Sequence, residues 1–206
     1  MGTVSEPTSD RSRRWAATME GYEGGADDVT VAHVDSSATI DAARPDGRAV
    51  AATRQARQPD FYRTLGVADS PEGRFELYSL HVVLLLHRLK GESGAAAETA
   101  QALFDAYVGA LDNALRELGV GDLSVAKKMR RLGEAFYGRA KAYEAILSAR
   151  DRTELLALIE RTVFADAPSP GCGALADYVL AAADGLTNQP LEAILEARPT
   201  WPAVSA

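Results

Sequence analysis

The longest apolar stretch of the chain lies between Phe75 and Lys90, where bulky aliphatic side chains cover every direction of a helix turning about 100° per residue. A strand of this length and leucine content would be unusual, so the pattern predicts a central buried helix. Its most apolar part, Leu77 to Leu86, is half the length of a membrane-spanning helix, which needs roughly 20 residues. We therefore expect a buried helix and no membrane span.

Two long amphipathic segments follow this stretch. In each, the apolar residues recur every three or four positions, which is the spacing of one helix face. The first stripe consists of Ala100, Phe104, Tyr107, Leu111, Leu115 and Leu118, and the second of Val125, Met129, Leu132, Phe136, Ala140, Tyr143 and Leu147. Gly119-Val120-Gly121 separates them, and we expect Asp122 or Ser124 to cap the second helix.

Shorter helical patterns complete the chain. They cover Thr153 to Phe164 and Gly173 to Ala183, and a last short helix starts at Pro190, a residue suited to the first helical position. The total is five or six helices with no expected strand. The sequence thus predicts an all-α fold, a single helical bundle-like domain with antiparallel neighbours.

The N-terminal residues differ in composition. Residues 1–58 are rich in small and polar residues, and their alternating stretch Val29 to Val34 is too short for an independent sheet. We expect a largely disordered tail with one helix across Arg48 to Arg57, ended by Pro59. Residues 59–206 would then form the all-α domain.

Composition supports one soluble domain plus a tail. The 206 residues carry 22 basic and 29 acidic side chains, a formal charge of -7, and 47% are hydrophobic. Cys172 is the sole cysteine, which excludes an intramolecular disulfide and a thiolate metal cluster and favours a reducing compartment. With no secretion signal or transit peptide expected, we predict a cytoplasmic bacterial protein, peripheral on the inner membrane face if attached to a membrane.

Residues that carry chemistry are sparse. The histidines are His33, His81 and His87, and the last two lie six residues apart, so they do not share a helix face and no carboxylate pair joins them. Cys172 lies between two glycines, where a reactive thiol is the alternative to a structural one. Gly119-Val120-Gly121 lacks the preceding strand of a nucleotide loop. We expect no catalytic site, no metal and no cofactor.

A basic segment stands out in this acidic chain. Ser124 to Arg152 holds eight basic residues against three acidic ones, and four of the basic residues project opposite the apolar stripe. The eight are Lys127, Lys128, Arg130, Arg131, Arg139, Lys141, Arg150 and Arg152. One interpretation is a solvated helix face, and the other is a docking surface for phosphate or an acidic partner. Because no aromatics are interleaved for base stacking, we do not expect DNA binding.

A second candidate surface is Asp60 to Glu76. Phe61, Tyr62, Leu65 and Val67 are bulky for a loop, and Ser70-Pro71-Glu72-Gly73 has the composition of a turn. Bulky loop residues usually cap a core. The alternative is an apolar groove that binds another chain.

Several segments resemble the ubiquinol-cytochrome c chaperone family, the assembly factors of the cytochrome bc1 complex. They occur in the family's order over roughly residues 56 to 165. They are Ala56-Arg57-Gln58-Pro59-Asp60-Phe61-Tyr62, Gly73-Arg74-Phe75-Glu76-Leu77 continuing to Leu80-His81, Arg88-Leu89-Lys90, Leu115-Arg116-Glu117-Leu118-Gly119-Val120-Gly121-Asp122-Leu123-Ser124-Val125, and Phe136-Tyr137-Gly138-Arg139.

The resemblance implies a helical, non-enzymatic chaperone that holds newly made cytochrome b while haem is inserted. Mitochondrial members work with a small helper protein and bind the ribosome, which would give the basic helix an anionic target. Our hypothesis is a bc1 assembly chaperone with cytochrome b or other bc1 subunits as partners and a membrane or the ribosome as docking site. The expected contact residues are Phe61, Tyr62, Arg74, Phe75, Lys127, Lys128, Arg130, Arg131, Arg139 and Lys141. The rivals are a general helical adaptor and a haem-handling protein that uses His81 or His87.

Overall fold

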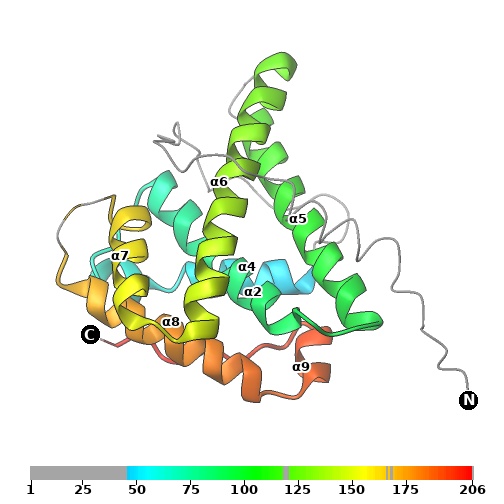
Figure 1. Cartoon of the computed structure of the whole chain (residues 1–206). Coiled ribbons are helices and arrows are strands. Elements are labelled where there is room, and N and C mark those ends of the chain that lie inside the picture. The colour runs from blue at the N-terminus through cyan, green and yellow to red at the C-terminus, as the bar shows by residue number, and fades with distance from the viewer. Residues whose placement is uncertain (1–45, 118–120, 166, 168, 206) are drawn as a thin grey trace, which may run out of the picture.

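A computed structural model describes residues 46–117, 121–165, 167 and 169–205. These residues form eight helices and no strand, which confirms the all-α prediction (Figure 1). Six helices have ten or more residues, close to the five or six expected. The helices are α2 (Gly47–Ala56), α3 (Pro59–Arg63), α4 (Pro71–Leu89), α5 (Ala95–Glu117), α6 (Asp122–Ala149), α7 (Arg152–Thr162), α8 (Gly171–Asn188) and α9 (Leu191–Leu195).

Helix α4 is the centre of the fold, as the sequence predicts. It packs against α2, α5, α6 and α8, and its aliphatic side chains from Leu77 to Leu85 are almost completely buried. The helix begins four residues before the expected Phe75. Ser70 is the N-cap, with its hydroxyl accepting from the backbone N–H of Gly73, and Pro71 occupies the first turn. Ser70-Pro71-Glu72-Gly73 is therefore a helix start and not the separate turn that we expected.

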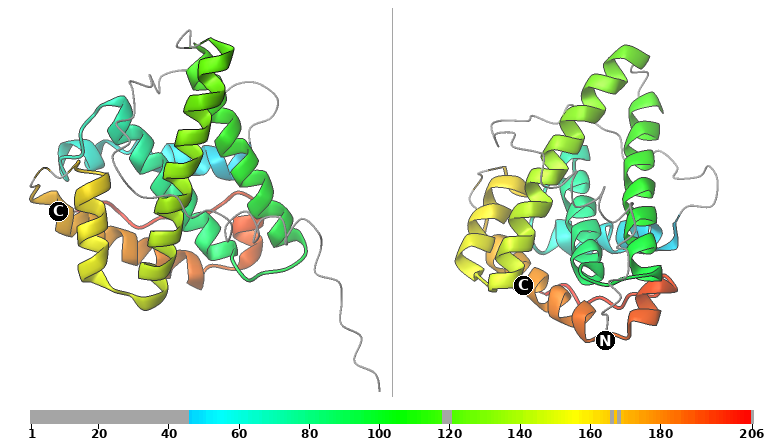
Figure 2. Two further views of the ribbon diagram at one scale, coloured as in Figure 1. Left: turned by 45° about the horizontal axis from the view of Figure 1, so that its top comes forward. Right: turned by 45° about the vertical axis from the view of Figure 1, so that its right-hand side comes forward.

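Helices α5 and α6 form a long antiparallel hairpin. The predicted stripe of α6 faces inward, since all seven residues are buried except Met129, which is half-buried. The predicted cap is wrong, because Gly121 is the N-cap and makes no side-chain hydrogen bond, while Asp122 and Ser124 already lie in the helix. Leu118, Gly119 and Val120 lie outside the described residues. The C-terminal end of α5 and the N-terminal end of α6 project beyond the other helices (Figures 1 and 2).

Helix α2 belongs to the core, although we assigned its residues to the tail. The helix predicted at Arg48 to Arg57 is present, and Ala49, Ala52 and Ala56 are buried against neighbouring helices. Alanine has a short side chain, so the α2 backbone approaches its neighbours closely without bulky residues. The packed part of the chain therefore begins before Pro59. Residues 1–45, which include His33 and the Val29 to Val34 stretch, lie outside the described residues.

The last three helices pack on different parts of the bundle, with α7 against α6 and α8, α8 against α4 as well, and α9 against α5. Helix α7 follows α6 and is capped by Asp151, whose carboxylate accepts from two backbone amides. Helix α8 starts two residues before the predicted Gly173 and continues five residues beyond Ala183. Pro190 is the N-cap of α9, so this helix begins at Leu191, one residue later than expected. None of the described helices is both long and apolar enough to cross a membrane.

Candidate functional site

The aromatic segment after Pro59 is part of the core. Phe61 is fully buried and Phe75 is 5% exposed, while Leu65 and Val67 are buried beside them. The ring of Phe61 makes edge contacts with His81 and Tyr178, at centroid distances of 5.5 and 5.0 Å. Phe61 and Phe75 are therefore not exposed contact residues, and the core-capping interpretation of this segment is the correct one. The physical reason is that α3 and its following loop close over α4 and α8.

Tyr62 and Arg74 lie at the edge of this segment. The hydroxyl of Tyr62 donates to the carbonyl of Ala56 at 2.7 Å, and burial raises the pKa of Tyr62 to about 12. Arg74 is one-third exposed and forms an ion pair with Asp69 at 2.7 Å. Its hydrogen bond holds the pKa of the Asp69 carboxyl below the usual value. Both residues are accessible in part, but each already has an intramolecular partner.

Arg139 faces the interior and is not part of an exposed basic face. Its Nη2 donates to the Glu76 carboxylate on α4 at 2.6 Å, and the two side chains are 17% and 8% exposed. Burial raises the pKa of Glu76 to about 7, against the opposing effect of Arg139. The pair joins α6 to α4. Sequence reasoning did not identify Glu76, although an acid within an apolar run was the available signal.

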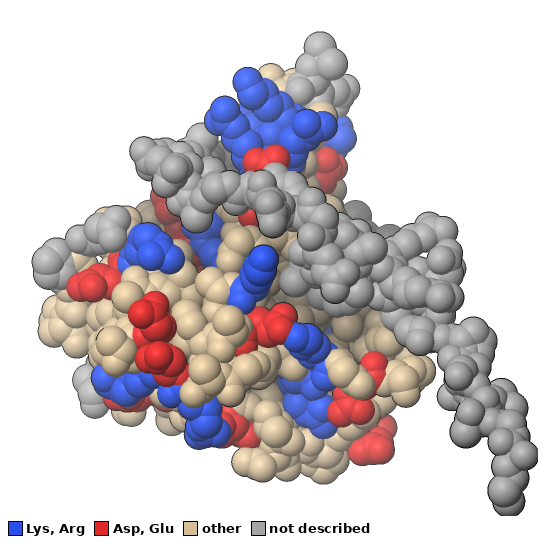
Figure 3. All heavy atoms as spheres, in the orientation of Figure 1, with Lys and Arg blue, Asp and Glu red and all other residues tan. Residues whose placement is uncertain are grey.

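Four of the predicted cations lie at the projecting end of α6. We call Lys127, Lys128, Arg130 and Arg131 the tip cluster. Lys127, Arg130 and Arg131 are exposed and Lys128 is half-buried, and none of the four forms an ion pair with a described residue. Figure 3 shows Lys and Arg atoms gathered at this end of the molecule. Lys141 is also exposed, but it lies about three turns further along α6.

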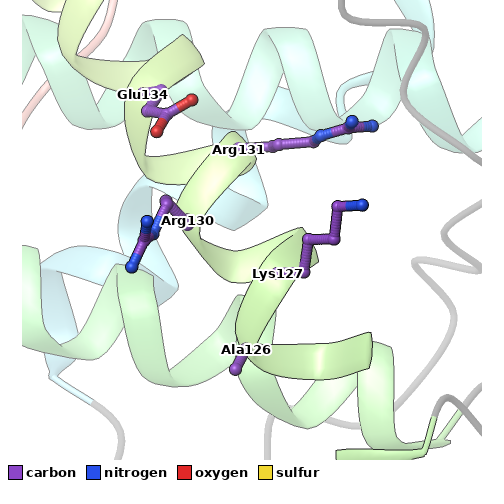
Figure 4. Close-up of a pocket in the computed structure, with 5 residues that line it drawn as sticks. All are labelled: Ala126, Lys127, Arg130, Arg131 and Glu134. Atoms are coloured by element: carbon purple, nitrogen blue, oxygen red, sulfur yellow. The ribbon is translucent and has the colours of Figure 1, made fainter. Parts of the chain in front are cut away.

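Three members of the tip cluster line a hollow of about 420 Å³. Ala126 and Glu134 complete its lining, and all five residues come from α6. Lys127 and Arg131 extend to one side of the helix, whereas Arg130 extends to the other (Figure 4). Glu134 lies further along α6 and is the acidic member. Of the eight basic residues in the predicted basic segment, the structure thus brings four together, while Arg139, Lys141, Arg150 and Arg152 lie elsewhere on the molecule.

His81 is fully buried and has a partner at each ring nitrogen. Its Nδ1 lies 2.7 Å from the carbonyl of Leu77, an acceptor, so Nδ1 carries the proton. Its Nε2 then accepts from the hydroxyl of Tyr178 at 2.9 Å, and Gln55 donates to that same hydroxyl at 3.1 Å. Burial lowers the pKa of His81 to about 4. This geometry is that of a neutral structural histidine in a packed network.

The other candidate groups are also enclosed. Cys172 is 6% exposed, and desolvation raises the pKa of its thiol, which keeps it in the unreactive protonated form. His87 is half-buried, and burial lowers its pKa. Among the described residues, no three metal-ligating side chains are grouped as a metal site would need.

Comparison with known proteins agrees with the resemblance in the sequence. The family model for the ubiquinol-cytochrome C chaperone matches residues 63–201, which is more than half of the chain. Among solved structures, the crystal structure of the Cbp3 homolog from Brucella abortus has 38% sequence identity and a TM-score of 0.71, and the match covers 77% of this chain and 88% of that one. A search of curated proteins finds no match. The chain belongs to the ubiquinol-cytochrome c chaperone family.

Proposed function

We propose that this protein is a non-enzymatic chaperone for assembly of the cytochrome bc1 complex and that it binds newly made cytochrome b or another bc1 subunit. The observation that supports the proposal most strongly is the family match over residues 63–201. The agreement of the fold with the Cbp3 homolog, over 77% of this chain at 38% identity, supports the same assignment. The family match supports a role in bc1 assembly. The binding of cytochrome b or another bc1 subunit is the further step that the proposal adds, and it is the part to be tested.

The buried network around His81 favours this proposal over haem handling by that residue. A haem ligand needs a free ring nitrogen, whereas His81 uses both ring nitrogens in hydrogen bonds inside the core. Ligation would require the Tyr178 bond to break and the surrounding aromatic contacts to open. Cys172 is enclosed as well, which supports a contact function rather than a chemical one.

The proposed location follows from the client. Cytochrome b is a membrane protein, so we propose that this chaperone, whose described helices do not span a membrane, works as a cytoplasmic protein that attaches peripherally to the inner membrane. A small helper protein and the ribosome remain expectations from the family. With Phe61 and Phe75 in the core, client binding would require accessible residues other than these two.

The direct test is affinity purification of the tagged full chain from membranes solubilised in mild detergent. We expect cytochrome b or other bc1 subunits to co-purify, and an equally expressed tag without the protein serves as the control. Recovery should be highest during active synthesis of the complex, because the proposed client is newly made. Absence of every bc1 subunit from the eluate under these conditions would overturn the proposal.

A further inference from the structure

We propose that the tip cluster docks this protein on the anionic headgroups of a lipid bilayer, with the free end of the α5–α6 hairpin facing the membrane. The inference rests on the proposed function in one respect: a membrane-embedded client has to be reached by a chaperone whose described helices do not span the membrane. The argument itself rests on the charges, pairing and position of Lys127, Lys128, Arg130 and Arg131.

The first observation is the lack of intramolecular partners in the tip cluster. Most cations on the body are neutralised by a nearby carboxylate. The pairs are Arg48–Asp46, Arg74–Asp69, Arg88–Glu92, Lys90–Glu144, Arg139–Glu76, Arg150–Asp184, Arg152–Asp177 and Arg198–Glu196. The four tip cations lie within five consecutive positions and have no such pair among the described residues. Their charge is therefore available to an external anion.

The second observation is their separation from the acidic body. Arg139 and Glu76 join α6 to α4, and the tip cluster begins twelve residues before Arg139 and ends eight residues before it. At 1.5 Å per residue these cations lie about 12 to 18 Å from that junction. The Debye length at physiological ionic strength is about 8 Å. Salt thus weakens the influence on the tip of the acidic side chains that lie on the described body at or beyond this junction.

The third observation is the arrangement of the charges around the helix. At about 100° per residue, Arg130, Lys127, Arg131 and Lys128 span an arc of about 160° in that order, with Lys127 and Arg131 opposite Arg130 in Figure 4. Because the four basic side chains spread around the end of the projecting hairpin, several of them can contact a flat surface at the same time. Long basic side chains also fit headgroups well, since their aliphatic stems can lie along apolar surface.

Other charged groups near the tip cluster change the local positive potential but do not cancel it. Asp112 is paired with Arg116 on α5, Glu117 is exposed, and Glu134 lines the far end of the hollow. The N-terminus of α6 adds partial positive charge, because its N-cap Gly121 supplies no side-chain acceptor. No aromatic residue lines the hollow, so the base-stacking platform of a single-stranded RNA site is not present there.

The test measures binding of the purified full chain to vesicles. One set is phosphatidylcholine alone, and the other contains one third phosphatidylglycerol. Each Lys or Arg near an anionic surface strengthens binding about fivefold at low salt. We therefore expect the Lys127→Gln/Arg130→Gln/Arg131→Gln variant to bind anionic vesicles about one hundredfold more weakly. Wild-type binding should be lost on neutral vesicles and at about 0.5 M salt.

A matched control separates location from net charge. Arg54, Arg63 and Arg161 are exposed cations on the body, without an ion pair to another described residue. The Arg54→Gln/Arg63→Gln/Arg161→Gln variant has the same net charge as the tip variant, and we expect its vesicle binding to stay within about threefold of wild type. Equal losses in the two variants would overturn the proposal. Circular dichroism verifies that both variants remain helical.

The remaining outcomes also decide the question. Equal binding to neutral and anionic vesicles would overturn the inference, because the attachment would then be apolar. Tip-dependent binding to polyuridylate with no binding to anionic vesicles would assign the cluster to RNA instead. Vesicle binding uses purified protein without any client, so its failure alongside successful recovery of bc1 subunits would reject the docking surface and leave the proposed function standing.

Discussion

The guanidinium of Arg139 on α6 binds the carboxylate of Glu76 on α4 with 2.6 Å between Nη2 and Oε1, and both side chains are largely buried. The pair lies where the α5–α6 hairpin meets the central helix. Both charges of the pair act on the pKa of Tyr107 and of Tyr143, which Glu76 raises and Arg139 lowers. It is therefore a buried polar junction between the body and the projection.

Removing the arginine should destabilise the fold in a pH-dependent manner. We expect Arg139→Met to lower the free energy of unfolding by about 3 kcal/mol at pH 8, because a buried carboxylate loses its counter-charge. The loss should be smaller at pH 6, where Glu76 carries a proton. Urea unfolding followed by circular dichroism measures both values.

The double variant Glu76→Gln/Arg139→Met is the control for this interpretation. At pH 8 it should be more stable than Arg139→Met alone, since a neutral amide needs no counter-charge. A cost for Arg139→Met that is the same at both pH values would contradict the proposed role of the Glu76 charge.

Glu76 should also impose its own pH dependence on wild-type stability. Its pKa is about 7 in the fold, against 4.5 for an exposed glutamate, so between these two pH values the folded state holds a proton that the unfolded state has released. Its contribution is full below pH 4.5 and is lost as pH rises through about 7. The difference in unfolding free energy between wild type and Glu76→Gln should therefore fall over this window, by on the order of 2 kcal/mol. A flat difference would show that the carboxyl titrates normally.

His81 should act in the opposite direction. Its pKa is about 4 in the fold and 6.5 when exposed, so acid favours the unfolded state, which binds the proton more readily. The stability that His81 contributes is present above pH 6.5 and is lost as pH falls toward 4. We expect the difference between wild type and His81→Gln to decrease over this range, by on the order of 2 kcal/mol. Nuclear magnetic resonance titration of the His81 ring checks the pKa, and a value near 6.5 would refute the packed network.

Two glycines offer a matched test of the helix packing. A Cβ on Gly171 would lie 1.8 Å from the carbonyl oxygen of Leu65, whereas one on Gly109 would meet nothing within 4 Å. Gly171→Ala should thus cost about 1 to 3 kcal/mol because backbone has to move. Gly109→Ala lies in an open helix position of α5 and should stabilise by about 0.5 to 1 kcal/mol. Thermal unfolding of the two variants measures both effects, and shifts of the same sign would contradict the close approach of α8 to the α3 loop.

Hydrophobic periodicity predicted helices α4 to α8, because each buries a stripe of large side chains that is visible in the sequence. The short helix α9 was predicted from Pro190 instead. Helix α2 was misassigned because Ala49, Ala52 and Ala56 add little hydrophobicity, although their small size is what allows close packing. The aromatic residues around Phe61 illustrate a second limit. Bulky residues after a proline fit either a core cap or a binding groove, and only the position of α4 and α8 decides between them.

The candidate site also has one part that the sequence could predict and one part that it could not. The tip cluster was predictable because four cations fall within five positions of one helix, so they share a neighbourhood whatever the tertiary structure is. The inward position of Arg139 was not predictable, since its partner Glu76 is 63 residues away in the sequence. Local spacing therefore identifies the members of a helix surface, whereas long-range pairing decides which of them remain available.

The most direct measurement of the central claim is ubiquinol–cytochrome c reductase activity in membranes of a strain that lacks this gene. The account predicts that this activity and the cytochrome b content fall together, that other respiratory activities persist, and that the full chain restores both. Unchanged reductase activity and normal cytochrome b in the deletion strain would contradict a role in bc1 assembly.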